Sequence, residues 1–274
     1  MRKPADGVYG AEALFRFGEG VEADPNFRTS PDRNVFEWYE LVLAQEPKGL
    51  HIIDWGAGLG RFLPIFESIK PAQVTLVEPS TEAIPALREL EQSHSNLNVV
   101  AGGLGASVPR IKDPSNTLHF ANFVINCLPT PKQAFSRLAD SLRTGERVWI
   151  FTNVFVPSRT YSLLDFSNPF ASIKAQDGTL DFGLNTGGKI EIPPVAKTFE
   201  NRILKSGDCL VDVVHTIDEV RAAIEGADLP QAWTVRRAAI MPPCGFEHVI
   251  RPDEDFGTYG FVVLVLLLER GSNR

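Results

Sequence analysis

The stretch His51-Ile-Ile-Asp-Trp-Gly-Ala-Gly-Leu-Gly60 decides the fold, because a short apolar run is followed at once by three alternating glycines. The two isoleucines are β-branched and apolar, as a buried parallel strand requires. The glycines permit backbone conformations and close approaches that a Cβ would block. The stretch therefore predicts a strand and a glycine turn on which a ligand can lie directly against main chain.

A helix and a second strand are expected directly after this turn. Segment 61–70 has apolar residues at a helical period, which points the N-terminus of the helix at the glycine turn. Segment 73–78 alternates as a strand does and ends on the carboxylate of Glu78. An acid in that position after the second strand accepts hydrogen bonds from a ribose diol. Two other interpretations stay open: such turns occur in doubly wound proteins without a cofactor, and an acid that ends a strand is often a helix cap.

The spacing of the glycines disfavours two common nucleotide-binding loops. The dinucleotide pattern G-x-G-x-x-G, counted from Gly56, places its third glycine where this chain has Arg61. The phosphate-binding pattern G-x-x-x-x-G-K-S/T is absent as well. A pyrophosphate loop and an ordinary nucleotide triphosphatase therefore both lose support.

The remaining pattern, Asp-x-Gly-x-Gly-x-Gly from Asp54, resembles that of the class I S-adenosylmethionine-dependent methyltransferases, specifically over residues 48–80 and more weakly to 155. The resemblance implies that S-adenosyl-L-methionine is the cofactor. It also implies that the turn surrounds the methionine part, that Glu78 binds the ribose hydroxyls, and that the adenine lies beside the ends of strands three and four. The cofactor-binding residues are then Asp54, Gly56, Ala57, Gly58, Gly60, Glu78, Pro79, Gly103, Leu104, Asn126 and Cys127.

The rest of the chain continues as alternating strands and helices, which predicts an α/β fold with a doubly wound, mostly parallel sheet. Further strands are expected at 97–101, 119–126, 147–151 and 233–240. Further helices are expected at 81–92, 131–142 and 217–225, the last opening with the capping box Thr216-Ile-Asp-Glu219. The apolar run 261–268 should be covered on both faces and so belongs inside the sheet. In the resembling family the last strand is antiparallel, and we expect a sheet of seven strands.

Two regions outside this sheet are expected to govern substrate choice. Residues 1–47 contain a helical pattern at 35–44 and are predicted to form a lid or flank. Residues 48–274 are predicted to form the S-adenosylmethionine-binding domain. Within that domain, residues 154–206 are rich in Pro, Gly, Ser and Asn, so this excursion is either functional or disordered. We expect it to be a substrate cap that runs into a hairpin at 201–214.

The chain departs from the family pattern after strands three and four. The sequence Ala101-Gly-Gly-Leu-Gly-Ala106 offers no acid to an adenine amine, so main-chain groups must substitute. The sequence Asn126-Cys-Leu-Pro-Thr-Pro131 lacks the Asn-Pro-Pro-aromatic signature of the enzymes that methylate amino groups of DNA and protein glutamine. Asn126 either binds the cofactor or acceptor or caps the following turn. Cys127 is interpreted as a small packing residue rather than a nucleophile.

Composition narrows the partners and the compartment. A net charge of -7 and a pI near 5.3 disfavour a nucleic-acid substrate, which needs clustered lysine and arginine, so a small molecule is the expected partner. The three cysteines lie far apart, without metal-ligand spacing, which favours a reducing cytoplasm and no metal site. The longest apolar run is too short to span a bilayer, so no membrane partner is expected. A homodimer stays open.

The function implied by the resemblance is methyl transfer to a small-molecule acceptor at O, N or C, in secondary metabolism or detoxification. The transfer is an in-line displacement that chiefly requires alignment. An acceptor that must lose a proton would need a base. The candidates are Tyr161, Asp165, His215, Glu247 and His248, and of these Tyr161, His215 and His248 are selected. His51 and His119 are discounted, because they stand at the edge of the sheet remote from the cofactor.

Two alternatives are kept. The first is an S-adenosylmethionine-binding protein of methyltransferase fold that no longer transfers methyl and uses the pocket for a cyclisation or for structure. The second is a nucleic-acid or protein methyltransferase, for which the chain offers no basic stripe and no appended binding module.

Overall fold

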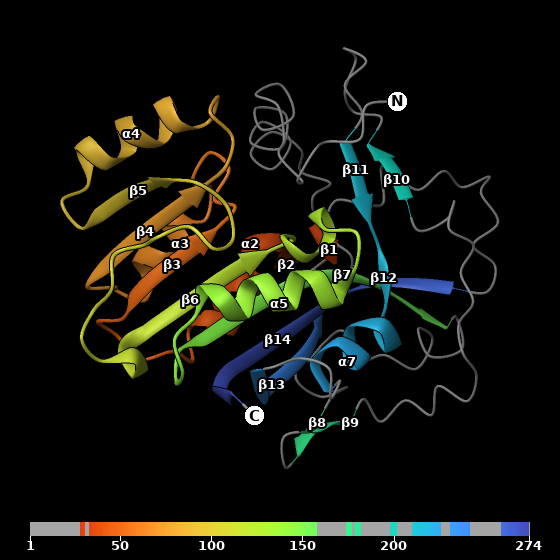
Figure 1. The fold of residues 1–274 in the computed structure, drawn as a ribbon. Coiled ribbons are helices and arrows are strands. Elements are labelled where there is room, and N and C mark those ends of the chain that lie inside the picture. Colours follow the sequence, from red (N-terminus) through yellow and green to blue (C-terminus); the bar gives the residue numbers. More distant parts are fainter. Residues whose placement is uncertain are drawn as a thin grey trace.

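A mixed sheet with helices on both faces forms the centre of the computed structural model (Figure 1). The structure describes residues 28–30, 33–157, 174–176, 179–181, 198–201, 210–225, 231–241 and 259–273, and every structural statement concerns these residues. The main strands are β3 (His51–Trp55), β4 (Gln73–Glu78), β5 (Leu97–Ala101), β6 (Thr117–Asn122), β7 (Arg147–Pro157), β13 (Gln231–Met241) and β14 (Tyr259–Asn273). Their order across the sheet is β13-β14-β7-β6-β3-β4-β5. This order confirms the expected fold class.

Strands β3 to β7 are parallel, whereas β14 is antiparallel to both of its neighbours, β7 and β13. The side chains from Val262 to Leu268 are all buried, which is why this segment is apolar without alternation. The prediction of an interior, antiparallel last strand is therefore confirmed. A short strand, β12 (His215–Thr216), pairs in parallel with Val154 and Phe155 of β7, so the sheet has eight strands instead of the expected seven.

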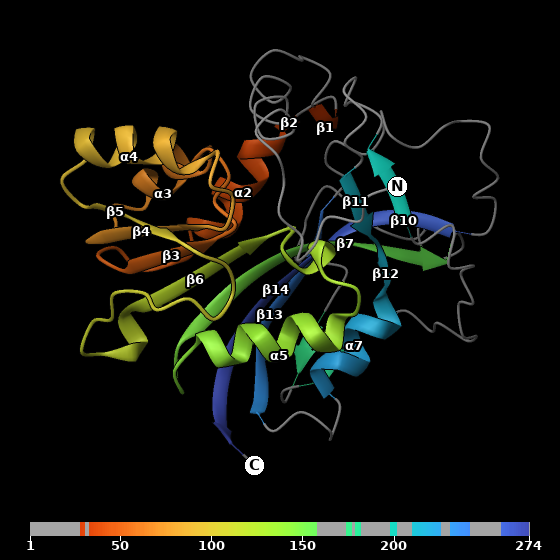
Figure 2. The same cartoon turned by 45° about the horizontal axis from the view of Figure 1, so that its top comes forward.

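Five described helices cover the sheet (Figure 2). They are α2 (Val35–Leu43), α3 (Leu63–Ser68), α4 (Ile84–Ser93), α5 (Pro131–Ser141) and α7 (Ile217–Glu225). Buried residues of α2, α3 and α4 pack with one face of the sheet, and those of α5 and α7 pack with the other. The capping box of α7 forms as expected, because Thr216 N donates to Glu219 Oε2 at 2.8 Å and Glu219 N donates to Thr216 Oγ1 at 3.1 Å.

Two strand ends differ from the sequence prediction. Strand β6 ends at Asn122 instead of 126, because Phe123 adopts a left-handed backbone with φ of 57°. Phe123 N donates to Phe151 O at 2.8 Å, and a 3-10 turn, η3 (Ile125–Cys127), follows. Strand β7 continues to Pro157 instead of ending at 151, since β14 pairs with it along its whole length. The first residues of the expected cap excursion therefore belong to the sheet.

The helices also begin later than expected, α3 at Leu63 and α4 at Ile84, because turns precede both of them. The segment between β5 and β6 is irregular except for a 3-10 turn, η2 (Pro114–Asn116). The expected hairpin has arms at β10 (Thr198–Asn201) and β11 (Leu210–Val213), so its first arm precedes the predicted start, and its turn lies outside the described residues. Two further small hairpins pair β1 (Arg28–Ser30) with β2 (Arg33–Asn34), and β8 (Lys174–Gln176) with β9 (Thr179–Asp181).

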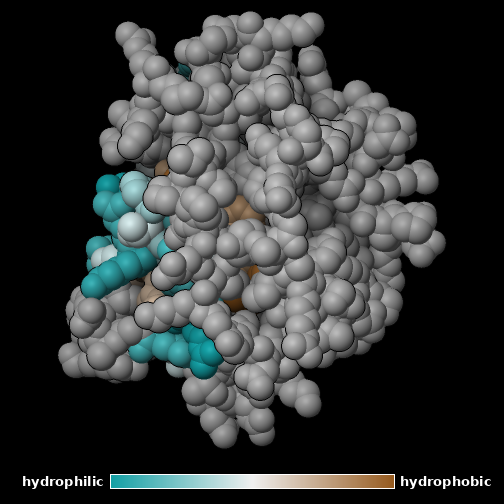
Figure 3. Space-filling view, turned by 90° about the vertical axis from the view of Figure 1, so that its right-hand side faces the viewer, coloured by the Kyte–Doolittle hydropathy of each residue, from teal (hydrophilic) through white to brown (hydrophobic). Residues whose placement is uncertain are grey.

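The described surface is mainly hydrophilic on the side shown in Figure 3, where hydrophobic residues are visible only as small recessed areas. Within the described part of the chain, no helix is long and apolar enough to cross a membrane.

Candidate functional site

The carboxyl ends of β3, β4 and β5 bring the glycine turn and Glu78 together, as the sequence predicted. Gly56, Gly58 and Gly60 have φ values of 72°, 59° and 79°. This left-handed region is open to glycine and strained for most other residues, so the local backbone requires glycine at all three positions. The turn therefore has the conformation that the spacing of the glycines indicated.

Most of the amide groups of the glycine turn are bonded inside the protein. Gly56 N and Ala57 N donate to Val77 O at 2.8 and 3.1 Å, and Gly60 N donates to Ala57 O at 2.9 Å. Gly58 N donates to Glu78 Oε2 at 2.7 Å. A phosphate-binding loop keeps such N–H groups for its anion. The turn is thus built to let a ligand approach main chain and not to hold a pyrophosphate.

Two of the glycines also permit close packing of the turn against its neighbours. A Cβ on Gly60 would lie 2.9 Å from Leu90 Cδ1 and 3.2 Å from Leu87 Cδ2, both on α4. A Cβ on Gly56 would lie 3.1 Å from Val124 Cγ2. These contacts give Gly60 a packing role, and a direct cofactor contact by Gly60 stays a prediction.

Two buried carboxyl groups, Asp54 and Glu78, flank the turn. Glu78 is held rigidly, because Oε2 accepts from Gly58 N and Oε1 accepts from Ser80 N at 2.8 Å. Each oxygen keeps a second lone pair for a ligand hydroxyl. Asp54 is 1% exposed, and its Oδ2 has no hydrogen-bond partner. Burial raises the pKa of Asp54 well above its usual range, and the charge of Glu78 raises it further, whereas Arg61 lowers it.

The turns after β4 and β5 lie against each other beside Glu78. Gly102 N donates to Glu78 O at 2.9 Å, and a Cβ on Gly103 would lie 3.9 Å from Pro79 Cβ. Leu104 packs against the hydrophobic core from this segment. The structure therefore brings together Pro79, Gly103 and Leu104, which the sequence assigned to the adenine side.

Asn126 is reassigned, because its side chain is fully used by the protein. Its Nδ2 donates to Asn153 O at 3.2 Å and to Val213 O at 2.9 Å. Its Oδ1 accepts from Thr152 Oγ1 at 3.0 Å and from Asn153 N at 3.1 Å. Neither cofactor binding nor capping of the next turn is compatible with these four bonds. Asn126 instead joins η3 to β7 and β11. Its neighbour Cys127 donates from Sγ to Phe123 O at 3.5 Å.

Asn122 stands where the sequence had placed Asn126, at the end of the strand next to the glycine turn. Its Oδ1 accepts from Tyr39 Oη at 2.6 Å, across 83 residues of sequence. Tyr39 comes from α2, is 2% exposed, and lies against Phe62 and Phe151. No local sequence signal indicates this pair, because the early end of β6 depends on the backbone of Phe123.

The three candidate bases are not brought together by the described structure. His215 is buried in β12, beside Val154 of β7. Tyr161 and His248 lie outside the described residues. A catalytic role for any of the three stays a prediction. No group of three or more His, Cys, Asp or Glu residues suited to a metal ion occurs in the described segments.

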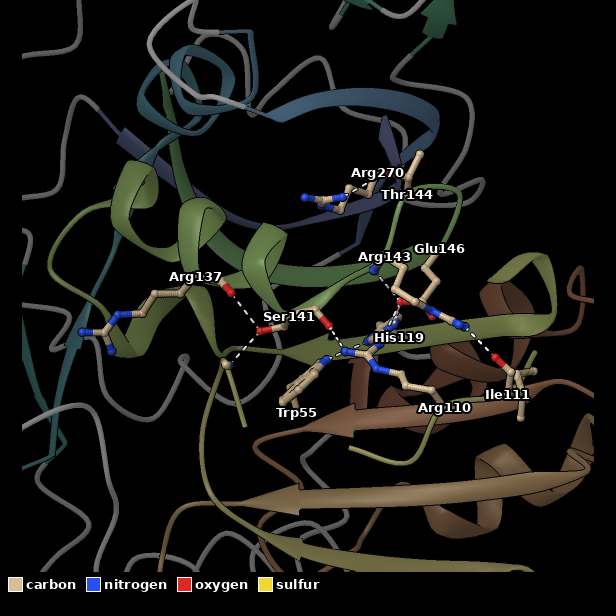
Figure 4. Close-up of polar contacts among 11 residues, drawn as sticks. Trp55, Arg110, Ile111, His119, Arg137, Ser141, Arg143, Thr144, Glu146 and Arg270 are labelled. Atoms are coloured by element: carbon tan, nitrogen blue, oxygen red, sulfur yellow. Dashed lines mark hydrogen bonds and ion pairs between the residues drawn. The ribbon is translucent and has the colours of Figure 1, made fainter. Parts of the chain in front are cut away.

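The two discounted histidines lie away from the glycine turn. His119 accepts from Trp55 Nε1 at Nδ1, at 2.9 Å, and its Nε2 contacts Glu146 Oε2 at 3.0 Å (Figure 4). His51 Nε2 bonds to Thr75 Oγ1 at 2.8 Å. Burial lowers the pKa of both imidazoles, that of His51 to about 4. Burial therefore disfavours the charged form of both histidines, which are part of the core.

Comparisons with known proteins agree with this geometry. A family model described as a methyltransferase domain matches residues 53–150, from β3 into β7. No curated protein sequence matches the chain.

Several solved structures share the fold. An S-adenosylmethionine-dependent methyltransferase from Mesorhizobium loti is 16% identical with a TM-score of 0.50, over 86% of this chain and 98% of its own. One from Aquifex aeolicus is 13% identical with a TM-score of 0.50, over 94% and 98%. The 4+2 cyclase SpnF is 11% identical with a TM-score of 0.56, over 100% and 98%. At these identities the likeness concerns the fold alone.

Proposed function

Because a family model described as a methyltransferase domain matches residues 53–150, and the glycine turn resembles that of the class I S-adenosylmethionine-dependent methyltransferases, we propose that the chain transfers the methyl group of this cofactor to a small-molecule acceptor. The observation that carries the proposal is the glycine turn between two buried carboxyl groups. A buried carboxyl oxygen without a partner is costly in a folded protein, and Asp54 Oδ2 is one. A ligand that brings a cationic group or a hydrogen-bond donor to this place would remove that cost.

The cofactor is S-adenosylmethionine, and the residues at this edge fit its chemical groups. Asp54 supplies an acceptor for a cationic amine, and Glu78 supplies lone pairs for a ribose diol. The left-handed glycines leave the main chain open to close approach. The turns at Pro79 and Gly103 supply a surface of apolar and main-chain atoms for adenine.

When bound, the cofactor supplies a sulfonium methyl group that is ready for displacement by a nucleophile. The chain itself contributes orientation. The bonds from Gly58 N and Ser80 N fix the carboxylate of Glu78, and the packing of Gly60 on α4 fixes the turn. Alignment of this kind is the main source of rate in an in-line transfer. A base for the acceptor, if the acceptor needs one, is proposed among His215, Tyr161 and His248.

Calorimetry with S-adenosylmethionine and with its demethylated product tests the proposal. We expect both ligands to bind the wild-type protein, and the variant Gly58→Asp to bind at least about tenfold more weakly, because its new carboxylate would face Glu78. Gly49→Asp is a matched control. Gly49 also has a left-handed φ, of 79°, but precedes β3 at the opposite edge of the sheet.

Three outcomes separate the alternatives. Failure of both ligands to bind at about millimolar concentration would overturn the proposal. Binding of the cofactor without turnover on O, N and C acceptors would favour a non-methylating role such as cyclisation. A salt-sensitive complex with RNA would favour a nucleic-acid substrate.

A further inference from the structure

A second buried polar group without partners lies at the same edge of the sheet, on β7. The side chain of Asn153 is 0% exposed, and neither its Oδ1 nor its Nδ2 has a hydrogen-bond partner. Burying a whole unpaired carboxamide is among the costly features of a protein interior, and such groups are rare. The side chain of Asn153 is therefore a candidate for hydrogen bonding to a ligand.

The main-chain groups of Asn153 already have hydrogen-bond partners, so they do not account for the unpaired side chain. Beyond Asn122, strand β6 no longer runs beside β7. The carboxamide of Asn126 takes its place and bonds to both the N–H and the carbonyl of Asn153. On the other side of β7, Val263 of β14 stands opposite Asn153. The strand is thus completed around Asn153, while its side chain is left unpaired on one face.

Asn122 presents a second carboxamide on that same face. Asn122 is in register with Phe151, and Asn153 is the next residue of β7 on the Phe151 face, because side chains alternate along a strand. Tyr39 Oη donates to Asn122 Oδ1 and so fixes the orientation of this amide. No described residue accepts a hydrogen bond from Asn122 Nδ2. The carboxamides of Asn122 and Asn153 are therefore diagonal neighbours on adjacent strands, and together they offer N–H donors and a carbonyl acceptor to a ligand.

The position of the two amides relative to the cofactor indicates which ligand they would meet. In the order β5-β4-β3-β6-β7, the residues proposed for adenine and ribose stand on β5 and β4, and the glycine turn follows β3. Strands β6 and β7 continue on the opposite side of β3. A molecule that approaches the methyl end of the cofactor from the side away from the adenosine lies over these two strands.

We propose that the carboxamides of Asn153 and Asn122 bind the methyl acceptor, and that the acceptor presents an uncharged amide-like edge with a carbonyl beside an N–H, as in a lactam. This inference rests on the proposed function. A carboxamide pairs by two hydrogen bonds with an edge that has one donor and one acceptor. A carboxylate or phosphate on the acceptor would need a cationic partner, and the described side chains that hydrogen-bond to these two residues across the sheet, Tyr39 to the side chain of Asn122 and Asn126 to the main chain of Asn153, are uncharged.

Stability gives the first test, because the proposal makes Asn153 a group that destabilises the ligand-free protein. Asn153→Leu replaces the unpaired amide with an apolar side chain that branches at the same carbon. We expect it to raise the melting temperature by about 2 °C or more. Thr117→Val is the matched control, since Thr117 is also buried, its Oγ1 also lacks a partner, and it begins β6 at the opposite edge. The control should gain stability in the same way without affecting binding.

Binding gives the decisive test. Protein labelled with ¹⁵N and saturated with S-adenosylhomocysteine is titrated with the lactam 2-pyridone, and separately with the carboxylate picolinate. We expect 2-pyridone to shift the side-chain amide signals of Asn122 and Asn153 and picolinate to leave them in place. The dissociation constant for 2-pyridone should rise at least about fivefold in Asn153→Leu and stay unchanged in Thr117→Val.

The outcomes separate this inference from the function on which it rests. If S-adenosylhomocysteine does not bind, the proposed function fails. If it binds but 2-pyridone shifts neither amide, or binds Asn153→Leu as tightly as wild type, the proposed acceptor site is wrong. A fall in melting temperature for Asn153→Leu would also overturn it, because the amide would then stabilise the fold.

Discussion

Two groups of buried polar side chains at opposite edges of the sheet differ in how well they are paired. Near the start of β7, both carboxylate oxygens of Glu146 are bonded, to Arg110, His119 and Arg143, at 2.7 to 3.0 Å. At the carboxyl edge, Asp54 Oδ2 and both amide atoms of Asn153 have no partner. We take the Glu146 cluster to serve the fold, and we propose that Asp54 and Asn153, at the edge of the glycine turn, serve a ligand.

The Glu146 cluster holds the segment between β5 and β6 in place, and this segment contains no α-helix. Arg110, in the irregular segment between β5 and β6, bonds to Glu146 Oε2 at 2.8 Å and to Ser141 O at 2.6 Å (Figure 4). Gly105 N, from the same segment, donates to Ser141 Oγ at 2.7 Å. Polar bonds to α5 and to the start of β7 thus hold a segment that does not pack as a helix. Pairing is not complete at this edge, because His51 Nδ1 and Thr117 Oγ1 lack a hydrogen-bond partner.

Breaking the Glu146 cluster should have the largest effect on stability. Glu146→Ala leaves His119 and two arginines without their buried carboxylate, and we expect the free energy of unfolding to fall by about 3–5 kcal/mol. Urea unfolding measures this change. Glu225→Gln, which removes an exposed ion pair with Arg221, should change stability by less than about 1 kcal/mol. A small effect of Glu146→Ala would contradict the structural role.

Asn126→Leu should have the next largest effect, and its sign should be opposite to that of Asn153→Leu. The change removes four hydrogen bonds and leaves the main chain of Asn153 unpaired. We expect a loss of about 2–4 kcal/mol in urea unfolding. If Asn126→Leu and Asn153→Leu changed the free energy of unfolding equally, the distinction between the paired amide of Asn126 and the unpaired amide of Asn153 would be wrong.

Acidification should destabilise the protein through its buried histidines. Burial lowers the pKa of His51 to about 4 and lowers that of His119, against an ordinary value of 6.5. The contribution of these neutral histidines to the free energy of unfolding is therefore complete above pH 6.5, and it is lost as the pH falls through their folded-state pKa values. For His51 this is at most about 3 kcal/mol, because a pKa unit corresponds to about 1.4 kcal/mol.

Unfolding in urea at pH 7 and pH 5 measures the loss. In His51→Asn the difference between the two pH values should shrink. An unchanged difference would show that His51 does not titrate as its burial implies.

Asp54→Asn should raise the free energy of unfolding slightly, because burial and the charge of Glu78 raise the pKa of Asp54 and so disfavour its ionised form in the folded protein. Cofactor affinity should respond as well. An ammonium group binds the ionised form, so the affinity of wild type should rise with pH up to the raised pKa. Calorimetry at a series of pH values below that at which the cofactor's own amine loses its proton should show this rise in wild type and not in Asp54→Asn. A parallel rise in both proteins would exclude Asp54 as its source.

The sequence predicted the parts of the fold and site that depend on local pattern. The glycine turn, Glu78 and the strands on either side were predicted because an apolar run, three glycines and a terminal acid lie close together in the chain. The capping box of α7 is equally local.

Asn122 and Asn153 could not be predicted in this way. The end of β6 depends on the left-handed backbone of Phe123, and the length of β7 depends on β14, which is distant in sequence. The partners of Asn126 come from η3, β7 and β11 together. Burial without a partner is a property of that assembly, and nothing in the residues around Asn153 signals it.

Hydrogen exchange with and without S-adenosylhomocysteine tests the central claim most directly, because it reports on both edges of the sheet in one experiment. We expect the ligand to increase protection at 54–60, 78–80 and 102–104, and to leave 143–148, around Glu146, unchanged. Unchanged protection at the carboxyl edge, or a larger change around Glu146, would contradict the assignment of the ligand to the glycine turn.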